Sequence, residues 1–326
     1  MALKRWSSPV LGGITLLLFG LNTLFWGSTL LLFAFIKMII PHAGIKHHLS
    51  RLLILIGFIW IEGNSFTIRM TRRIQWDVQG LEQLSNTGSY LVLSNHRSWT
   101  DIFVLQHIFK RRIPFLKFFL KQELIWVPIL GMAWWALDFP FLKRYSRSFL
   151  EKHPELRGKD METTRKKCEK FKTQPVSVMN FVEGTRFTYQ KHKKQNSPYR
   201  HLLSPKAGGV ALVLSSMGDY LSNVVDVTIV YPRNEAPVGF WDMLAGNITC
   251  IIVRVQVLPV PENVAGANYE EDPAFREKMQ QWVNRLWQTK DRQIEVLLTE
   301  KNATIGSDLR DGSNTMTAGQ KRGAKP

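Results

Sequence analysis

The most distinctive hydrophobic pattern lies near the N-terminus. Residues 10–40 are almost all apolar, with Asn22 and Lys37 among the few interruptions. A helix needs roughly 20 such residues to cross a bilayer, so this run predicts a spanning helix, tilted or broken near residues 20–22. A cleavable signal peptide is the alternative, but the run is too long and no small-residue cleavage site closes it. A second apolar run, 52–61, is too short to span alone and is predicted to lie in the interface or against the first run.

After residue 62 the pattern changes to that of an α/β protein. Short apolar runs typical of buried strands alternate with segments of helical periodicity. The predicted strands are 90–93, 176–182, 224–230 and 250–257, and the predicted helices are 102–109, 123–137, 159–171 and 205–217. This alternation predicts an α/β fold with a mixed sheet covered by helices.

The C-terminal part contains one long amphipathic pattern at 272–300, which opens with the cap-like residue Asp272. From Asn302 onward large apolar residues are almost absent, which predicts a disordered tail. The chain is therefore divided into an N-terminal membrane anchor (1–62), a folded domain (63–300) and a tail (301–326).

The net charge of the chain limits the kinds of partner that it can have. Lys and Arg total 43 against 26 Asp and Glu, which gives a net charge of +17. An excess of this size implies a polyanionic neighbour: nucleic acid, an anionic bilayer surface or phosphorylated substrates. Cations such as Lys46 and Arg51 follow the first apolar run, whereas Lys4 and Arg5 precede it. The positive-inside rule then favours a cytoplasmic folded domain.

Cysteine and histidine positions form no metal-binding pattern. The two cysteines, Cys168 and Cys250, are far apart, and the eight histidines add no zinc-ligand spacing. The sequence therefore predicts neither a metal site nor a disulfide framework, and reduced thiols on the cytoplasmic side fit this pattern.

The first candidate for catalysis is the segment 94–101, Ser-Asn-His-Arg-Ser-Trp-Thr-Asp, directly after a predicted strand. Loops at strand ends often carry catalytic groups, and this one carries His96. A strand-to-helix turn can bring the Asp101 carboxylate back to the imidazole, leaving the other ring nitrogen to take a proton from an alcohol. Because the chain has no Gly-x-Ser-x-Gly elbow, the alcohol is expected to belong to a substrate. Taken alone, this His–Asp spacing is also compatible with chance.

A second segment follows another predicted strand and contains Glu183, Gly184, Thr185 and Arg186. Gly184 permits a tight turn, Thr185 adds a hydroxyl donor, and Arg186 offers a forked donor for phosphate. A solvated turn is the plainer interpretation of this segment taken alone.

Together with a third stretch, these segments resemble the PlsC-type glycerolipid acyltransferases. The shared features are an Asn-His-x4-Asp block, Lys-x-Glu-Leu at 121–124, Phe-x-x-Arg at 141–144, a Glu-Gly-Thr-Arg block and an apolar strand ending in Pro232. They occur in the family order between Val78 and Pro232. In detail the blocks are similar to bacterial YihG-type proteins, akin to the lysocardiolipin acyltransferase-like subgroup. One departure is Val182, where many family members have proline, and it bears on headgroup preference.

The resemblance implies a glycerolipid acyltransferase fold and a role for each motif residue. The implied catalytic residues are His96 as general base, Asp101 as its orienter and Lys121 as a partner for the oxyanion. The implied substrate-binding residues are Asn95, Phe141, Arg144, Glu183, Gly184, Thr185 and Arg186. The implied donor is acyl-CoA or acyl-carrier protein and the acceptor a lysophospholipid, first among them 1-acyl-sn-glycerol-3-phosphate. Neither a cofactor nor a metal ion is implied.

Alternative functions, within the acyltransferases and in other classes, stay open at this point. A glycerol-3-phosphate acyltransferase is the nearest one, and a non-catalytic basic membrane-binding protein is the most distant. A nucleic-acid binder would account for the charge but not for the spanning segment or the ordered motifs, so no nucleic acid is expected. The anchor and the resemblance together predict a bacterial inner-membrane protein with a cytoplasmic catalytic domain and a basic surface that contacts anionic lipids.

Overall fold

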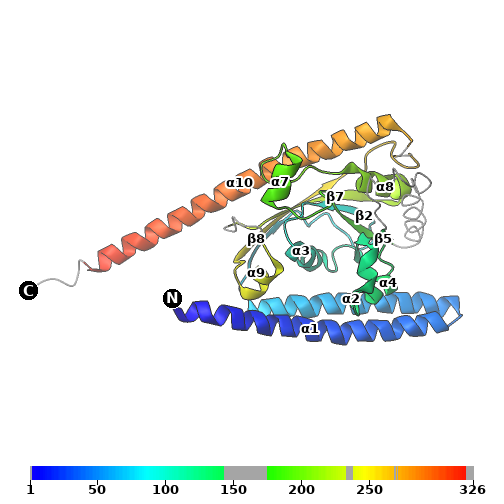
Figure 1. Ribbon diagram of the computed structural model, residues 1–326, viewed down its shortest axis with the longest axis horizontal. Helices are drawn as coiled ribbons and strands as arrows, with labels where there is room; N and C mark the ends of the chain where they lie inside the picture. Colours follow the sequence, from blue (N-terminus) through cyan, green and yellow to red (C-terminus); the bar gives the residue numbers. More distant parts are fainter. Residues whose placement is uncertain (1, 143–174, 233–237, 268, 270, 321–326) are drawn as a thin grey trace, which may run out of the picture.

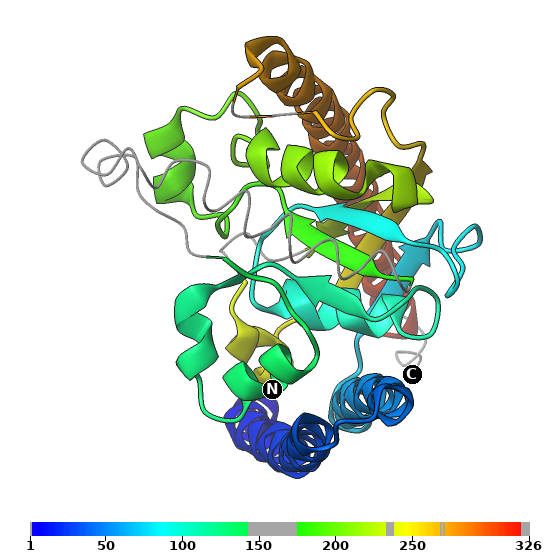
Figure 2. The same ribbon diagram turned by 90° about the vertical axis from the view of Figure 1, so that its right-hand side faces the viewer.

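The structure is a computed structural model that describes residues 2–142, 175–232, 238–267, 269 and 271–320. Its elements form three layers: a helical hairpin with short helices, a six-stranded sheet, and a pair of helices on the opposite face (Figure 1). Figure 2, which looks along the hairpin, places the hairpin on one side of the sheet and the long C-terminal helix on the other.

The hairpin consists of α1 (Ala2–Ile39) and α2 (Ala43–Thr71). Both helices are long and apolar enough to cross a membrane, by length and composition. No break occurs in α1 near residues 20–22, because the Asn22 amide is satisfied by α2: its Nδ2 donates to Trp60 O and to Asn64 Oδ1, both at 2.9 Å. The prediction of a short second segment is wrong, since polar flanking residues continue the helix on both sides of the apolar run.

Six strands form the central sheet in the order β1-β8-β7-β2-β6-β3. Their bounds are β1 (Gln75–Gln79), β2 (Tyr90–Ser94), β3 (Leu116–Phe118), β6 (Ser177–Phe181), β7 (Asn223–Val230) and β8 (Cys250–Leu258). Neighbouring strands are parallel except for β7 and β8, which are antiparallel. The predicted mixed sheet is therefore confirmed. A separate parallel pair joins β4 (Leu120–Lys121) to β5 (Phe141–Leu142).

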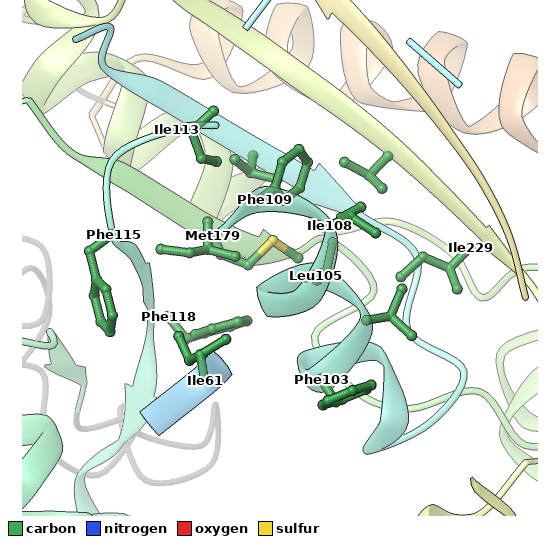
Figure 3. Packing of buried hydrophobic residues seen from close by; sticks show 14 of the residues in the cluster. Ile61, Phe103, Leu105, Ile108, Phe109, Ile113, Phe115, Phe118, Met179 and Ile229 are labelled. Carbon is green, nitrogen blue, oxygen red and sulfur yellow. The ribbon is translucent and has the colours of Figure 1, made fainter. Parts of the chain in front are cut away.

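Successive strand residues point to opposite faces and so supply two hydrophobic clusters. Tyr90 and Val92 belong to the cluster on the hairpin side, whereas Leu91 and Leu93 belong to the cluster on the other side. The first cluster also takes in α3 (Thr100–Phe109) and α9 (Phe240–Ala245). Figure 3 shows Leu105, Phe109 and Met179 packed together in this cluster, with Phe118 nearby.

The second cluster is covered by α8 (Ala207–Met217) and α10 (Pro273–Gln320). The expected cap is present, because Asp272 Oδ1 accepts the Phe275 N–H at 3.0 Å. The backbone of α10 continues past residue 301 as far as Gln320, where the sequence predicts a disordered tail. Each added residue of an already formed helix gains a backbone hydrogen bond without a new nucleation cost, which composition alone does not register.

The single helix predicted at 123–137 is instead divided into η1 (Gln122–Trp126) and α4 (Leu130–Ala136). The division follows from Pro128, which lacks an N–H, and from Ile129, whose φ is 64°. The helix predicted at 159–171 lies outside the described residues. Within the described residues, the remaining short helices are α7 (Tyr189–Gln195) and η4 (Gly218–Tyr220).

Candidate active site

Two loops meet at one edge of the sheet. Strands β2 and β6 are adjacent and parallel, with Ser94 opposite Phe181 at their carboxyl ends. The loop after β2 and the turn after β6 therefore start side by side, in the position where open α/β sheets commonly bind ligands. A backbone hydrogen bond of 2.7 Å from Phe187 N to His96 O joins them. The two motif segments, distant in sequence, are thus brought together.

His96 and Asp101 form the expected pair. His96 Nδ1 lies 2.9 Å from Asp101 Oδ2, and the Asp101 side chain is fully buried. The same oxygen accepts the Arg97 N–H at 2.6 Å and the Ser98 N–H at 2.8 Å, and Oδ1 accepts the Tyr231 hydroxyl at 2.6 Å. Asp101 also lies in the first turn of α3, where the helix dipole favours a negative charge. A carboxylate held in this way fixes the proton on Nδ1 and leaves Nε2 as the basic nitrogen.

The imidazole of His96 is held on one face by an aromatic ring. It stacks on Phe181 with ring centroids 3.8 Å apart and an interplanar angle of 13°, and Phe181 in turn stacks on Phe118. The His96 side chain keeps an exposed fraction of 12%. Among the described residues, none hydrogen bonds to Nε2. This nitrogen is therefore available to an incoming hydroxyl.

Glu183 is buried beneath the loops rather than open to a ligand. Its Oε1 accepts the His96 N–H at 3.0 Å and its Oε2 accepts the Leu203 N–H at 3.1 Å. Burial raises the pKa of Glu183 to about 8, against the two backbone donors, which favour the carboxylate. The substrate contact expected for Glu183 does not fit this geometry, because the carboxyl group is fully enclosed and holds the backbone of the base instead.

Asn95 shows a similar departure from expectation. Its Nδ2 donates to Ile229 O and its Oδ1 accepts the Ile229 N–H, both at 2.9 Å, and the side chain is fully buried. The amide thus continues the pairing of β2 with β7 by one step and fixes where the His96 loop begins. Substrate binding by Asn95 does not fit this arrangement either, because both of its polar atoms are occupied by the backbone.

The turn after β6 presents the residues that remain open. Gly184 has a φ of 68°, a conformation that favours glycine, and so confirms the predicted tight turn. Thr185 Oγ1 accepts from Lys191 Nζ at 2.7 Å. Arg186 is exposed, and its guanidinium carbon lies 4.8 Å from the centre of the Trp99 ring. It forms no ion pair with another described residue. Its donors are therefore available to an anion.

Comparisons with known proteins match the segment that carries these two loops. The family model described as Acyltransferase matches residues 75–232, from β1 to just beyond β7. The chain is 26% identical over 247 residues to 1-acyl-sn-glycerol-3-phosphate acyltransferase 3 of Arabidopsis thaliana, covering 72% of this chain and 59% of that protein. It is also 26% identical over 216 residues to 1-acyl-sn-glycerol-3-phosphate acyltransferase delta of Mus musculus, covering 62% of this chain and 51% of that protein. Residues 75–232 form an acyltransferase domain of the PlsC type.

The chain spans between about half and three fifths of the length of these relatives. Among solved structures, the 1-acyl-sn-glycerophosphate acyltransferase PlsC from Thermotoga maritima aligns with a TM-score of 0.48 and 16% identity, over 90% of this chain and 97% of that one.

Two further residues expected in the candidate site lie on the small β4–β5 sheet. Lys121 is exposed on β4, opposite Leu142, and its side chain makes no hydrogen bond or ion pair with another described residue. It follows β3 closely, and Phe118 at the end of β3 stacks on Phe181 next to the base. Phe141 is buried on β5, and its expected role as a substrate contact stays a prediction. Arg144 lies outside the described residues.

Tyr231 is a residue of the candidate site that sequence reasoning did not identify. Burial and the neighbouring Asp101 raise its pKa well above the usual range, so its hydroxyl stays protonated and donates to that carboxylate. Its position directly after an apolar strand and before Pro232 was visible in the sequence, but nothing local indicated its partner. Among the described residues, no cluster of three His, Cys, Asp or Glu side chains is placed to hold a metal ion.

Proposed function

We propose that this chain transfers a fatty acyl group from a thioester donor to the free hydroxyl of a lysophospholipid, with 1-acyl-sn-glycerol-3-phosphate as the first candidate. The observation that carries the proposal is the His96–Asp101 pair, whose outer ring nitrogen is open and whose carboxylate is buried. The similar plant and mouse proteins are named for the same reaction, which supports the proposal.

The proposed reaction balances without a covalent enzyme intermediate. His96 Nε2 takes the proton of the acceptor hydroxyl as its oxygen attacks the thioester carbonyl carbon. The carbon–sulfur bond then breaks, and the sulfur leaving group takes the proton back from His96. The products are an ester and a free thiol, and Asp101 stabilises the imidazolium between the two steps. Lys121, the exposed cation near the end of β3, is proposed to stabilise the oxyanion.

Recognition of the acceptor is assigned to the turn after β6. Arg186 is exposed with its fork of donors unoccupied among the described residues, and such a fork matches the geometry of a phosphate group. Trp99, beneath the guanidinium, holds it by a cation–π contact at 4.8 Å. Arg144 is retained as a second candidate contact from its motif alone. The donor is proposed to be acyl-CoA or acyl-carrier protein, without a cofactor.

The hairpin is proposed to hold the enzyme in a bacterial inner membrane with the catalytic domain on the cytoplasmic side. Large apolar side chains of α1 are exposed, among them Leu17, Phe25 and Met38. Such a surface on two long apolar helices suits lipid, and the basic surface suits anionic headgroups. Protease added outside spheroplasts is expected to spare the chain beyond Arg69. Cleavage there would reverse the proposed orientation.

The deciding experiment is an acyl-transfer assay of the purified full-length chain in lipid nanodiscs. The acceptors are a panel of lysophospholipids together with glycerol 3-phosphate, and each is tested with palmitoyl-CoA and palmitoyl-acyl-carrier protein. We expect transfer to 1-acyl-sn-glycerol-3-phosphate and little to glycerol 3-phosphate. Transfer to glycerol 3-phosphate alone would select the nearest alternative enzyme. Absence of transfer to any acceptor with either donor would contradict the proposed function.

A further inference from the structure

Two carboxylates of helix α10 hydrogen bond to the loop 199–203. Asp291 and Glu295 are four residues apart on α10 and so share one face of the helix. Asp291 Oδ2 accepts the Arg200 N–H at 2.9 Å, and Asp291 Oδ1 accepts the His201 N–H at 2.8 Å. Glu295 bonds the same two residues through their side chains, at 2.8 Å to Arg200 Nη1 and 2.5 Å to His201 Nε2. Two consecutive loop residues are thus held at both backbone and side chain.

The other side of this loop reaches the base. The His201 carbonyl accepts from Arg97 Nη1 at 3.2 Å, and Arg97 directly follows the base in the chain. The Leu203 N–H donates to Glu183 Oε2 at 3.1 Å, and Glu183 Oε1 accepts the His96 N–H at 3.0 Å. Hydrogen bonds therefore run from α10 through the loop to the residues on which the position of His96 depends.

Asp291 differs from Glu295 because it binds the backbone of the loop and not its side chains. Its two oxygens match two neighbouring N–H groups of the loop, so that each oxygen accepts one backbone hydrogen bond. An amide in its place would turn one acceptor into a donor and direct it at another donor. Glu277, an exposed acid nearer the start of α10, instead accepts from Gln281 on its own helix.

We infer that Asp291 is a positioning residue for the catalytic base, acting through loop 199–203 and Glu183. The effect of Asp291 on catalysis rests on the proposed function. Its effect on the position of the loop rests on the hydrogen bonds alone. Helix α10 lies outside the segment 75–232 that matches the family, so the family blocks by themselves do not contain this contact. The C-terminal helix therefore contributes contacts to the edge of the sheet that carries His96.

The test compares three variants of the full chain in nanodiscs: Asp291→Asn, Asp291→Glu and the matched control Glu277→Gln. We expect Asp291→Asn to lower kcat by about 10- to 100-fold with KM for the acyl donor nearly unchanged, since a small displacement of a base is costly. Asp291→Glu, which keeps both acceptors, should recover part of the loss. Glu277→Gln should behave as the parent chain.

Hydrogen exchange supplies a readout that does not depend on activity. In Asp291→Asn, the amides of His96 and Leu203 are expected to exchange faster, while those of β7 keep the exchange rates of the parent chain. An unchanged kcat, or a loss of activity that merely follows the fraction of unfolded protein, would overturn the inference. A parent chain without acyl transfer would contradict the proposed function, and the exchange rates would still decide whether Asp291 holds the loop.

Discussion

At the His96 site polar groups are enclosed and paired, whereas on the α1–α2 hairpin apolar side chains face outward. Asn95, Asp101 and Glu183 have an exposed fraction of 0%, yet each makes hydrogen bonds in fixed directions. On α1, Leu17 and Phe25 are each 62% exposed. The arrangement of the His96 site depends on the direction of a few hydrogen bonds. The properties of the hairpin depend on the extent of its apolar surface.

This contrast determines which changes each region tolerates. A hydrogen-bonded, buried carboxylate such as Asp101 loses its function when one atom changes, because each unmatched polar group bears a desolvation cost. An exposed apolar helix face accepts exchange of one apolar residue for another, but a charge on that face opposes transfer into lipid. The two regions can therefore be perturbed separately.

The largest effect is expected from charges on the hairpin. The double change Leu17→Lys and Leu24→Lys places two cations on one exposed face of α1, because seven residues make about two helical turns. Each lysine at the centre of a spanning helix costs roughly 2.5–3.5 kcal/mol of insertion free energy. We expect much of the protein to leave the membrane fraction during an alkaline wash.

The control for this prediction is Val296→Lys, which adds a cation at an exposed apolar position of α10. It should stay with the membrane as the parent chain does. Equal extraction of both variants would show that added charge, rather than the α1 surface, governs retention. Deletion of α1 is a poorer test, because Leu30 is fully buried and its loss would damage the core.

The base itself should give the next largest effect. We expect His96→Ala to lower kcat by about 10²–10⁴-fold, the usual loss when a positioned base is removed. Expression and membrane retention should not change, since the ring packs at the edge of the site. The matched control is His48→Ala, at an exposed position of α2. Near-normal turnover of His96→Ala in the acyl-transfer assay would refute the assignment of the base.

Sequence reasoning located the His96–Asp101 pair because both residues lie close together after a recognisable strand. It placed Glu183 and Asn95 in the site but gave them the wrong surroundings, since residue type does not reveal whether a side chain faces a ligand or the backbone of a neighbouring loop. Tyr231 and Asp291 were missed because their partners are distant in sequence. The long strands followed from apolar runs, whereas β3 and β4 are too short to show periodicity.

A smaller effect is expected at the phosphate contact. Arg186→Ala should raise KM for 1-acyl-sn-glycerol-3-phosphate by about 10- to 100-fold, the equivalent of one hydrogen bond to a charged group. KM for the acyl donor should not change. Arg186→Lys keeps the charge but loses the fork, so we expect an intermediate KM. A defect confined to the donor would contradict the assigned role.

The smallest effect concerns pH and stability. Because burial raises the pKa of Glu183 to about 8, the folded chain keeps a proton that the unfolded chain releases above its ordinary pKa near 4.5. This contribution to stability is complete below about pH 4.5 and is lost as the pH rises towards 8. Glu183→Gln removes it, so the parent chain should lose Tm relative to the variant between pH 5 and 8, by about 2–4 °C for each kcal/mol lost.

Parallel Tm curves for the two proteins over this range would mean that Glu183 is already ionised in the folded chain at neutral pH. Comparing the two proteins at each pH cancels the other titrating groups, including His107, whose pKa burial lowers to about 4.

The pairing of β1 with β8 has a consequence for biosynthesis. β1 has β8 as its neighbour in the sheet, and the two strands are separated by most of the folded domain in sequence. A ribosome therefore releases the hairpin and β1 long before β8 exists, and the contacts of α10 with loop 199–203 come later still. Long-range pairing of this kind closes late in folding. The hairpin can thus reach a bilayer while the sheet edge that carries His96 is still incomplete. Under the proposed function, acyl transfer would then begin only in a chain already delivered to its lipid.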